Sequence, residues 1–290
     1  MKAALAIVTM VYNEPVFLPV WLRHYGAQAG AAHCYVVDHG STDGSTLPAA
    51  TGEASVIRIP RSPQDDAVRT GFIADFCASL LSWYDAVIYT DVDELLVADP
   101  DAAPSLPAFA AGLAADAVVT AIGLDVIHAP DEEPALDWSR PLGRQRLWAR
   151  FSSAMCKPVL IRRRVAWAPG FHCIDDRPCL GRLFLLHLRY ADLPSGLERL
   201  RRTRAQPWIT PQAGSHQRMP DPDWEGMLRA MAGLPRDRGR SLDASDPELR
   251  RWLDRLMRSA DSRSLDQYRV DLHLSGDQLW ALPDRLRDRF

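Results

Sequence analysis

Lysine is nearly absent from this 290-residue chain: Lys2 and Lys157 are its only lysines, and every other basic residue is an arginine. We interpret this imbalance as a coding bias toward Arg and Ala, which indicates no function by itself. The formal net charge is −3, which argues against a general nucleic-acid binder. Hydrophobic residues make up 47% of the chain, enough for the core of one large domain or of one domain with an appendage.

The five cysteines form no Cys-X-X-Cys pair, and the odd count without a secretory signal predicts reduced thiols in a cytoplasmic protein. Cys173 and Cys179 lie near His172, but this spacing matches no common zinc finger. The apolar start lacks a small-residue cleavage site and is interpreted as a strand rather than a signal peptide. No apolar run reaches the roughly 18 to 20 residues that span a bilayer.

The first hundred residues alternate between strand and helix patterns. We predict strands at Ala4–Met10, Cys34–Asp38, Ser55–Ile59 and Ala86–Thr90, and helices from Pro15 and over Asp65–Trp83. Apolar stripes predict the buried faces of the two helices: Phe17, Leu18, Trp21, Leu22 and Tyr25 on the first, and Val68, Phe72, Phe76, Leu80 and Trp83 on the second. The alternation predicts an α/β fold with an open, mostly parallel sheet flanked by helices.

Beyond Asp99 the pattern is weaker. We predict helices at Ser105–Ala115, Leu197–Arg204, Trp224–Ala232 and Pro247–Ser259, and strands at Ala117–Leu124, Pro158–Trp167 and Leu183–Leu188. This pattern predicts a catalytic domain over residues 1–193 and a mainly helical extension over residues 194–290 that packs on it.

Three polar stretches follow predicted strands: Tyr12–Glu14, Asp38–Gly44 and Asp91–Glu94. In open α/β sheets, ligands bind outside the carboxyl ends of the strands. The stability of the fold does not require acidic residues at that edge. The shared position of the three polar stretches therefore predicts a binding site.

The stretch YTDVDELL places three carboxylates in four positions. In an extended segment Asp91 and Asp93 share a face and repel each other unless a cation lies between them. Mg²⁺ and Mn²⁺ are hard cations that prefer oxygen ligands. An Asp-X-Asp motif at the end of a strand therefore suits such a cation, which would bridge the protein to a diphosphate. The alternative is a solvated acidic turn.

The segments TMVYNEPVFLPVWLRHY, CYVVDHGSTDGS and YDAVIYTDVDELLV, in this order, resemble family 2-like glycosyltransferases of the GT-A fold. The resemblance covers about the first 100 residues and continues more thinly in KPVLIRRRVAWAPGFH and LLHLRYAD. The resemblance implies a metal-dependent transfer, with inversion, of a sugar from a nucleoside diphosphate, most commonly uridine diphosphate.

The resemblance also implies roles for single residues. Asn13 and Glu14 end the first strand, and Glu14 and Asp43 would contact the base and ribose with Asp38 nearby. Asp91 would hold the ribose or the sugar, and Asp93 the metal. His172 or His187 would complete the metal site, although a satisfied structural histidine is the alternative for each. The leaving diphosphate would be neutralised by basic residues of one segment: Lys157, Arg162, Arg163 and Arg164.

Inversion needs a carboxylate that deprotonates the acceptor hydroxyl. We favour Asp175 and Asp176 over Asp125 because they follow His172 in the segment where such a base tends to fall. An acidic loop is the alternative. The acceptor, whether a sugar, a lipid-linked sugar or a protein, is not indicated. Four arginines motivate a peripheral membrane contact: Arg199, Arg201, Arg202 and Arg204.

Other functions fit the motifs less well. A haloacid dehalogenase-like phosphatase would use Asp91 as nucleophile, but its motif normally lies on the first strand. A nucleotidyltransferase needs a Gly-rich basic loop after that strand, where this chain has VYNEP. A dinucleotide-dependent oxidoreductase needs Gly-X-Gly-X-X-Gly there. A non-catalytic nucleotide-sugar-binding protein of the same fold stays open.

Overall fold

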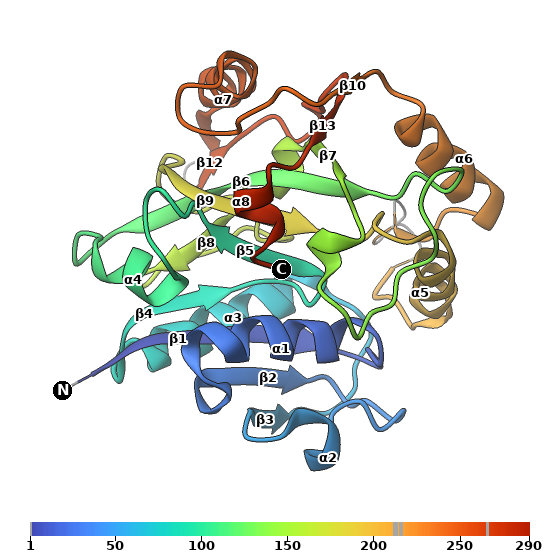
Figure 1. Cartoon of the computed structure of the whole chain (residues 1–290). Helices are drawn as coiled ribbons and strands as arrows, with labels where there is room; N and C mark the ends of the chain where they lie inside the picture. Colours follow the sequence, from blue (N-terminus) through green and yellow to red (C-terminus); the bar gives the residue numbers. More distant parts are fainter. Residues whose placement is uncertain (1, 211–213, 215–216, 265–266) are drawn as a thin grey trace.

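The computed structural model of the chain describes residues 2–210, 214, 217–264 and 267–290 (Figure 1). The strands are β1 Ala3–Val11, β2 Cys34–Asp38, β3 Ser55–Arg58, β4 Tyr84–Tyr89, β5 Glu94–Ala98, β6 Val118–Ile127, β7 Trp148–Phe151, β8 Pro158–Ile161, β9 Leu180–His187, β10 Arg236–Asp237, β11 Asp261–Ser264, β12 Gln267–Arg269 and β13 Leu279–Ala281. The helices are α1 Phe17–Ala29, α2 Pro48–Thr51, α3 Asp66–Leu80, α4 Leu106–Ala111, α5 Leu193–Ala205, α6 Asp221–Ala232, α7 Pro247–Ser259 and α8 Asp284–Arg287.

The predicted α/β fold is confirmed, and the first four strands form the parallel part of one large sheet. Their order is β3-β2-β1-β4, with β1 between β2 and β4. The register places Val11 beside Asp38 and Val8 beside Tyr89. The carboxyl ends of β1, β2 and β4 therefore reach the same edge of the sheet, as the strand order requires.

Strand β1 is buried on both faces because its alternate residues pack against different helices. Ile7 shares a core cluster with Phe17 and Trp21 of α1. Val8 shares a second cluster with Ile73 of α3. In Figure 1, α1 lies in front of this part of the sheet and α3 behind it. Four residues of the predicted stripe of α1 are confirmed as buried, Phe17, Leu18, Trp21 and Tyr25, and Leu22 is half-buried against the same core.

The predicted buried face of α3 is wrong for Val68, Phe72 and Trp83, whereas Leu80 is buried as predicted and Phe76 is half-buried. Val68 is 67% exposed and Phe72 is 37% exposed, whereas Ile73 and Cys77 are fully buried. Apolar residues occur around several sides of this helix, so two stripes of similar spacing compete for the core. The narrower side chains of Ile73 and Cys77 face the sheet, and the larger aromatic residues lie farther out.

The other half of the sheet mixes parallel and antiparallel pairs. β8 is antiparallel to both β4 and β6, and β9 lies between β6, to which it is parallel, and β5, to which it is antiparallel. The sequence did not predict β5, which follows β4 after a short turn. β8 ends at Ile161 rather than Trp167, because the chain folds back and the Trp167 indole N–H donates to the carbonyl of Pro158 at 2.9 Å.

The segment after residue 193 packs on the same sheet. Helices α5, α6 and α7 confirm the three predicted helical segments. The segment also adds strands, since β13 pairs with β7 and β10 pairs with β13. Trp252, Leu256 and Trp280 join the main core cluster. The division into two domains at residue 193 stays a prediction. Among the described residues, no helix has the length and apolarity to cross a bilayer.

Candidate functional site

The loops that follow β1 and β2 are bound to each other at the carboxyl edge of the sheet. The side-chain oxygen of Asn13 accepts a hydrogen bond from the backbone N–H of Thr42 at 2.8 Å. The backbone N–H groups of Asn13 and Glu14 donate to the hydroxyls of Ser41 and Ser45 at 3.0 and 3.3 Å. The predicted meeting of the first two polar stretches is therefore present.

Helix α1 fixes the third polar stretch, Asp91–Glu94. The Trp21 indole N–H donates to the hydroxyl of Thr90 at 2.9 Å. The Tyr25 hydroxyl donates to the carbonyl of Glu94 at 3.0 Å and accepts from the backbone N–H of Leu96 at 2.9 Å. The same stripe that builds the core thus sets the position of the acidic turn.

Both carboxylate oxygens of Asp91 are engaged by neighbouring side chains. Oδ1 accepts from Arg69 and from the hydroxyl of Tyr89 at 3.0 Å, and Oδ2 accepts from Lys157 at 3.0 Å. Burial alone would raise the pKa of Asp91, but Arg69 and Lys157 outweigh it and hold that pKa below its usual value. Asp91 is therefore ionised at neutral pH.

Lys157 lies beneath this turn and is 4% exposed. Its Nζ is 2.6 Å from Oε1 of Glu94 and 3.0 Å from Oδ2 of Asp91. Burial raises the pKa of Glu94, an effect that Lys157 opposes. The lysine thus joins two of the three carboxylates of the motif.

The third carboxylate, Asp93, faces His187 on β9. Because β9 lies between β5 and β6, its register places His187 beside Glu94 on one side and Asp125 on the other. The imidazole Nδ1 is 2.7 Å from Oδ1 of Asp125, and Nε2 is 3.4 Å from Oδ2 of Asp93. Burial lowers the pKa of His187, but the bonds to the two carboxylates outweigh burial and raise the pKa to about 9. His187 is therefore charged at neutral pH.

Asp93 and Glu14 converge on one guanidinium, that of Arg199 from α5. The Arg199 Nε donates to Oε1 of Glu14 at 2.9 Å, and its Nη1 donates to Oδ2 of Asp93. Burial raises the pKa of Glu14, and Arg199 opposes this. The other oxygen of Glu14, Oε2, is buried and has no hydrogen-bond partner among the described residues. It is an acceptor without a donor.

The expected Mn²⁺ or Mg²⁺ site is not what these residues form. Carboxylates and an imidazole do converge at Asp93, but the Arg199 guanidinium lies between Glu14 and Asp93 and both ring nitrogens of His187 face carboxylates. Within the described ranges, no group of three His, Cys, Asp or Glu side chains is arranged to hold a metal ion. The ring of His172 lies elsewhere, with Nδ1 2.8 Å from the carbonyl oxygen of Ala154. Protein cations balance the acids instead.

The second polar stretch has a structural part. Asp38 accepts from Arg58 at 2.8 Å, from the Thr46 hydroxyl at 3.0 Å and from the backbone N–H of Ser41 at 2.7 Å. Asp43 is exposed and bonds the N–H and hydroxyl of Ser45, as a turn residue does. Asp38 therefore orders the loop, and Asp43 is an exposed turn residue on it.

Arg162 and the predicted bases do not join this cluster. The guanidinium of Arg162 donates to the carbonyls of Asp85 and Leu113, at the opposite end of β4 from Asp91. The reason is the antiparallel direction of β8, whose carboxyl end lies beside the start of β4. Asp175 and Asp176 are exposed, and Asp176 pairs with Arg163 at 3.0 Å.

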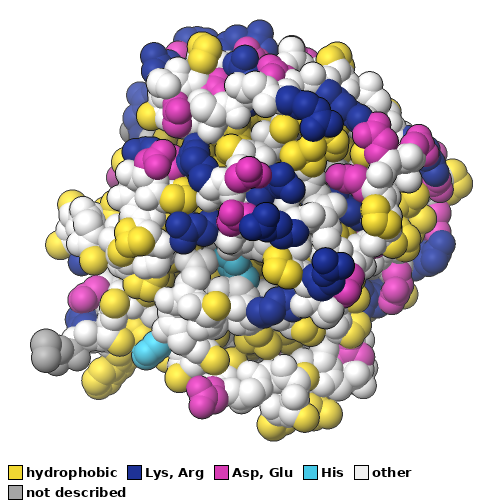
Figure 2. Space-filling view, in the orientation of Figure 1, with side chains coloured by type: hydrophobic (Ala, Val, Ile, Leu, Met, Phe, Trp, Pro, Cys, Tyr) yellow, Lys and Arg dark blue, Asp and Glu magenta, His cyan; other side chains and the backbone are white. Residues whose placement is uncertain are grey.

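The sequence missed the cations that balance the acids. Arg69 lies on the predicted helix before β4, where no motif distinguishes it from a surface arginine. Arg199 was one of four arginines attributed to a membrane surface. Of the others, Arg201 and Arg204 pair with Asp221, so these residues form no free basic stripe. Figure 2 likewise shows basic and acidic side chains intermixed over the visible face. Only Lys157 stands out in the sequence, because it is one of two lysines in a chain whose other basic residues are arginines.

No protein family and no curated protein matches the chain. A search of solved structures finds similarity to a Bacillus anthracis protein assigned as a glucose-1-phosphate thymidylyltransferase, crystallised with sucrose. The two chains are 10% identical, and the match covers 78% of this chain and 82% of that one with a TM-score of 0.28. A similarity at this level carries no argument about fold or function.

Proposed function

We propose that the chain is a glycosyltransferase that moves a sugar, with inversion, from a nucleoside diphosphate donor to an acceptor hydroxyl. The donor that we expect is a uridine diphosphate sugar. The observation that carries the proposal is the meeting of Tyr12–Glu14, Asp38–Gly44 and Asp91–Glu94 at the edge where β1, β2 and β4 end. Open α/β sheets bind ligands at this edge. The three stretches are also those that resemble the GT-A glycosyltransferases.

Glu14 supports the nucleotide part of the proposal. Its buried Oε2 has no donor among the described residues, and a buried acceptor without a donor costs about 1–3 kcal/mol. A ring N–H of a base or a ribose hydroxyl would supply that donor. Asn13 and Asp38 would act indirectly, because they hold the backbone of the surrounding loops.

Cations support the transfer step. As the bond between sugar and diphosphate breaks, negative charge develops on the leaving diphosphate, and preorganised cations lower the free energy of that transition state. Arg199 is the cation of α5 closest to Glu14 and Asp93. Among the described residues, protein cations and not a metal site balance the carboxylates at this edge.

The acceptor must also lose a proton. The carboxylates of Asp91, Asp93 and Asp125 are committed to cations or to His187. Asp175 and Asp176 stay our proposed bases because both are exposed and, among the described residues, Asp175 forms no ion pair. The phosphatase alternative is weaker, because a nucleophilic Asp91 needs a free carboxylate oxygen. Both oxygens of Asp91 accept hydrogen bonds, from Arg69, Tyr89 and Lys157.

Donor consumption tests the proposal. Purified protein is incubated with a panel of nucleoside diphosphate sugars, with and without Mn²⁺, and release of nucleoside diphosphate is measured. We expect release from one donor, at least about tenfold slower in Asp91→Asn. The matched control is Asp75→Asn, which changes an exposed carboxylate on α3. No release from any donor, or Asp91-dependent hydrolysis of phosphate monoesters, contradicts the proposal.

A further inference from the structure

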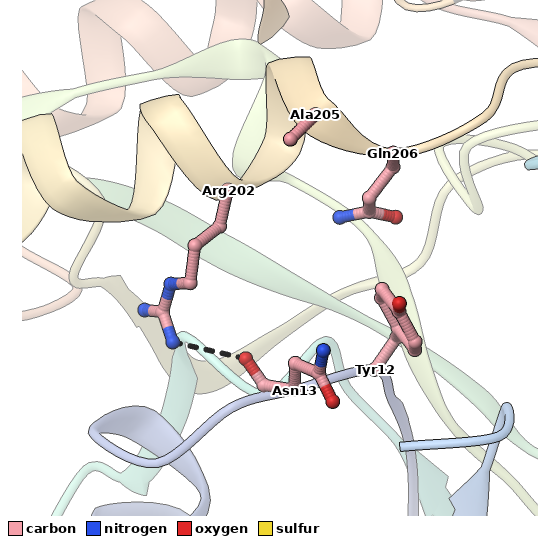
Figure 3. A pocket seen from close by; sticks show the side chains of 5 residues that line it. All are labelled: Tyr12, Asn13, Arg202, Ala205 and Gln206. Atoms are coloured by element: carbon pink, nitrogen blue, oxygen red, sulfur yellow. Dashed lines mark hydrogen bonds between the residues drawn. The ribbon is translucent and has the colours of Figure 1, made fainter. Parts of the chain in front are cut away.

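A cavity of about 150 Å³ lies between the end of β1 and helix α5. Its lining residues are Tyr12, Asn13, Arg202, Ala205 and Gln206. Figure 3 shows that Arg202, Ala205 and Gln206 come from α5 and its end and lie across from Tyr12 and Asn13. The cavity adjoins the carboxylate edge, because Arg202 is one helical turn beyond Arg199.

Arg202 holds the wall of this cavity with part of its guanidinium. Its Nη1 donates to the backbone carbonyl of Asn13 at 3.0 Å (Figure 3). Asn13 adopts a φ of +53°, in the left-handed region that asparagine enters more readily than most other non-glycine residues. The Nε of Arg202 is buried and has no hydrogen-bond partner among the described residues.

A second arginine, Arg61, contacts two of the lining residues. Its guanidinium carbon lies 3.8 Å from the centre of the Tyr12 ring, and its Nη2 donates to the side-chain oxygen of Gln206 at 3.2 Å. Its Nη1 lies 2.9 Å from Nδ1 of His39. Its Nε is also buried without a partner in the described part of the chain.

These two arginines differ from their neighbours in charge compensation. Arg199 pairs with Glu14 and Asp93, and Arg58 pairs with Asp38. Within the described ranges, no carboxylate forms an ion pair with Arg61 or Arg202. Both guanidinium groups are half-buried, and each has a buried Nε without a hydrogen-bond partner among the described residues, so each has a donor to spare.

An anion with several oxygens in this cavity would meet the Arg202 guanidinium and would offset the charge of Arg61 behind its contacts with Tyr12 and Gln206, and phosphate matches the donor fork of a guanidinium. The cavity is smaller than the roughly 300 Å³ at which small-molecule sites begin, so it suits a phosphate group rather than a whole nucleotide sugar. We propose that the Tyr12–Arg202 cavity is an anion subsite that binds a phosphate of the donor diphosphate. The identity of that donor rests on the proposed function, whereas the preference for a phosphate rests on Arg61 and Arg202.

Calorimetric titration of inorganic pyrophosphate into the full-length protein in EDTA tests the subsite. We expect binding without metal, at least about tenfold weaker in Arg61→Gln and in Arg202→Gln. The matched control is Arg201→Gln, on the same helix but paired with Asp221, and its affinity should equal that of the wild type. Gln206→Glu is a further variant, since a carboxylate beside Arg61 should compete with pyrophosphate and weaken its binding without removing an arginine.

The outcomes separate the subsite from the proposed function. Absence of pyrophosphate binding, or equal affinities in Arg61→Gln, Arg202→Gln and the wild type, overturns the subsite. Consumption of a nucleotide sugar with unchanged KM in both variants also overturns the subsite, while the proposed function holds. Pyrophosphate binding that depends on both arginines, without binding of any nucleotide sugar, supports the subsite and counts against the proposed function.

Discussion

The side-chain nitrogen of Lys157 lies 2.6 Å from a carboxylate oxygen of Glu94, and both side chains are almost completely buried. The contact joins the residue that precedes β8 to the first residue of β5, two segments far apart in the chain. Breaking a buried pair by removing one partner leaves an uncompensated charge in a medium that solvates it poorly. The acidic motif therefore depends on a lysine that lies outside it.

Replacement of this lysine should destabilise the protein strongly. We expect Lys157→Met to lower the free energy of unfolding by about 3–5 kcal/mol, measured by urea denaturation. The chain supplies the control, since Lys2 is its only other lysine and is exposed. Lys2→Met should change the free energy by less than about 0.5 kcal/mol. A loss below about 1 kcal/mol for Lys157→Met would show that Asp91 and Glu94 do not need the charge.

The imidazole of His187 should make stability depend on pH. Its pKa is about 9 in the folded protein against an ordinary value of 6.5, so the folded state holds a proton that the unfolded state has lost between these values. The contribution is complete below pH 6.5 and disappears as the pH rises through about 9. The free energy of unfolding of the wild type should fall across this window by on the order of 3 kcal/mol more than that of His187→Gln. Parallel curves for the two proteins would refute this role of His187.

Removal of Arg199 should create a response to metal. In the wild type the guanidinium lies between Glu14 and Asp93, so saturating Mn²⁺ should leave the unfolding temperature of the nucleotide-free protein unchanged. Arg199→Ala releases both carboxylates beside His187, which are suitable ligands for Mn²⁺. Mn²⁺ should then raise the unfolding temperature of the variant by about 2–4 °C or more. A rise of equal size in the wild type would mean that the metal displaces Arg199.

A pair of glycines tests the seating of α5. A Cβ at Gly196 would lie 2.2 Å from the Trp224 ring of α6, whereas a Cβ at Gly226 on α6 would have nothing within 4 Å. Gly196→Ala should therefore destabilise the protein by about 1–3 kcal/mol through overpacking. Gly226→Ala should stabilise it by up to about 1 kcal/mol because alanine favours a helix interior. Thermal unfolding measures both, and changes of the same sign would show that α5 can shift away from α6.

The sequence predicted the edge of the sheet better than the chemistry on it. Local patterns define β1, β2 and α1, because apolar runs and helical spacing reflect burial directly. The meeting of Asn13 with the loop after β2 follows from parallel strand order, which is a topological rule rather than a contact. These predictions needed no knowledge of distant partners.

The partners of the acids could not be predicted in the same way. Lys157 and Arg199 reach Glu94 and Asp93 across 63 and 106 positions of the chain. Nothing local distinguishes Arg199 from Arg201, two positions further along the same helix, yet one faces the acids and the other faces Asp221. Two carboxylates at alternate positions suggest a metal because the local sequence shows the acids and not the distant basic residues that pair with them. Tertiary packing supplies the cations.

Binding of nucleoside diphosphates is the most direct test of the central claim, that this edge receives an activated sugar donor. Calorimetric titration with the diphosphates of uridine, guanosine, cytidine and thymidine should show one that binds, with at least about tenfold lower affinity in Glu14→Gln and unchanged affinity in Asp75→Asn. Binding of none of the four, or binding that Glu14→Gln leaves unchanged, would contradict the account.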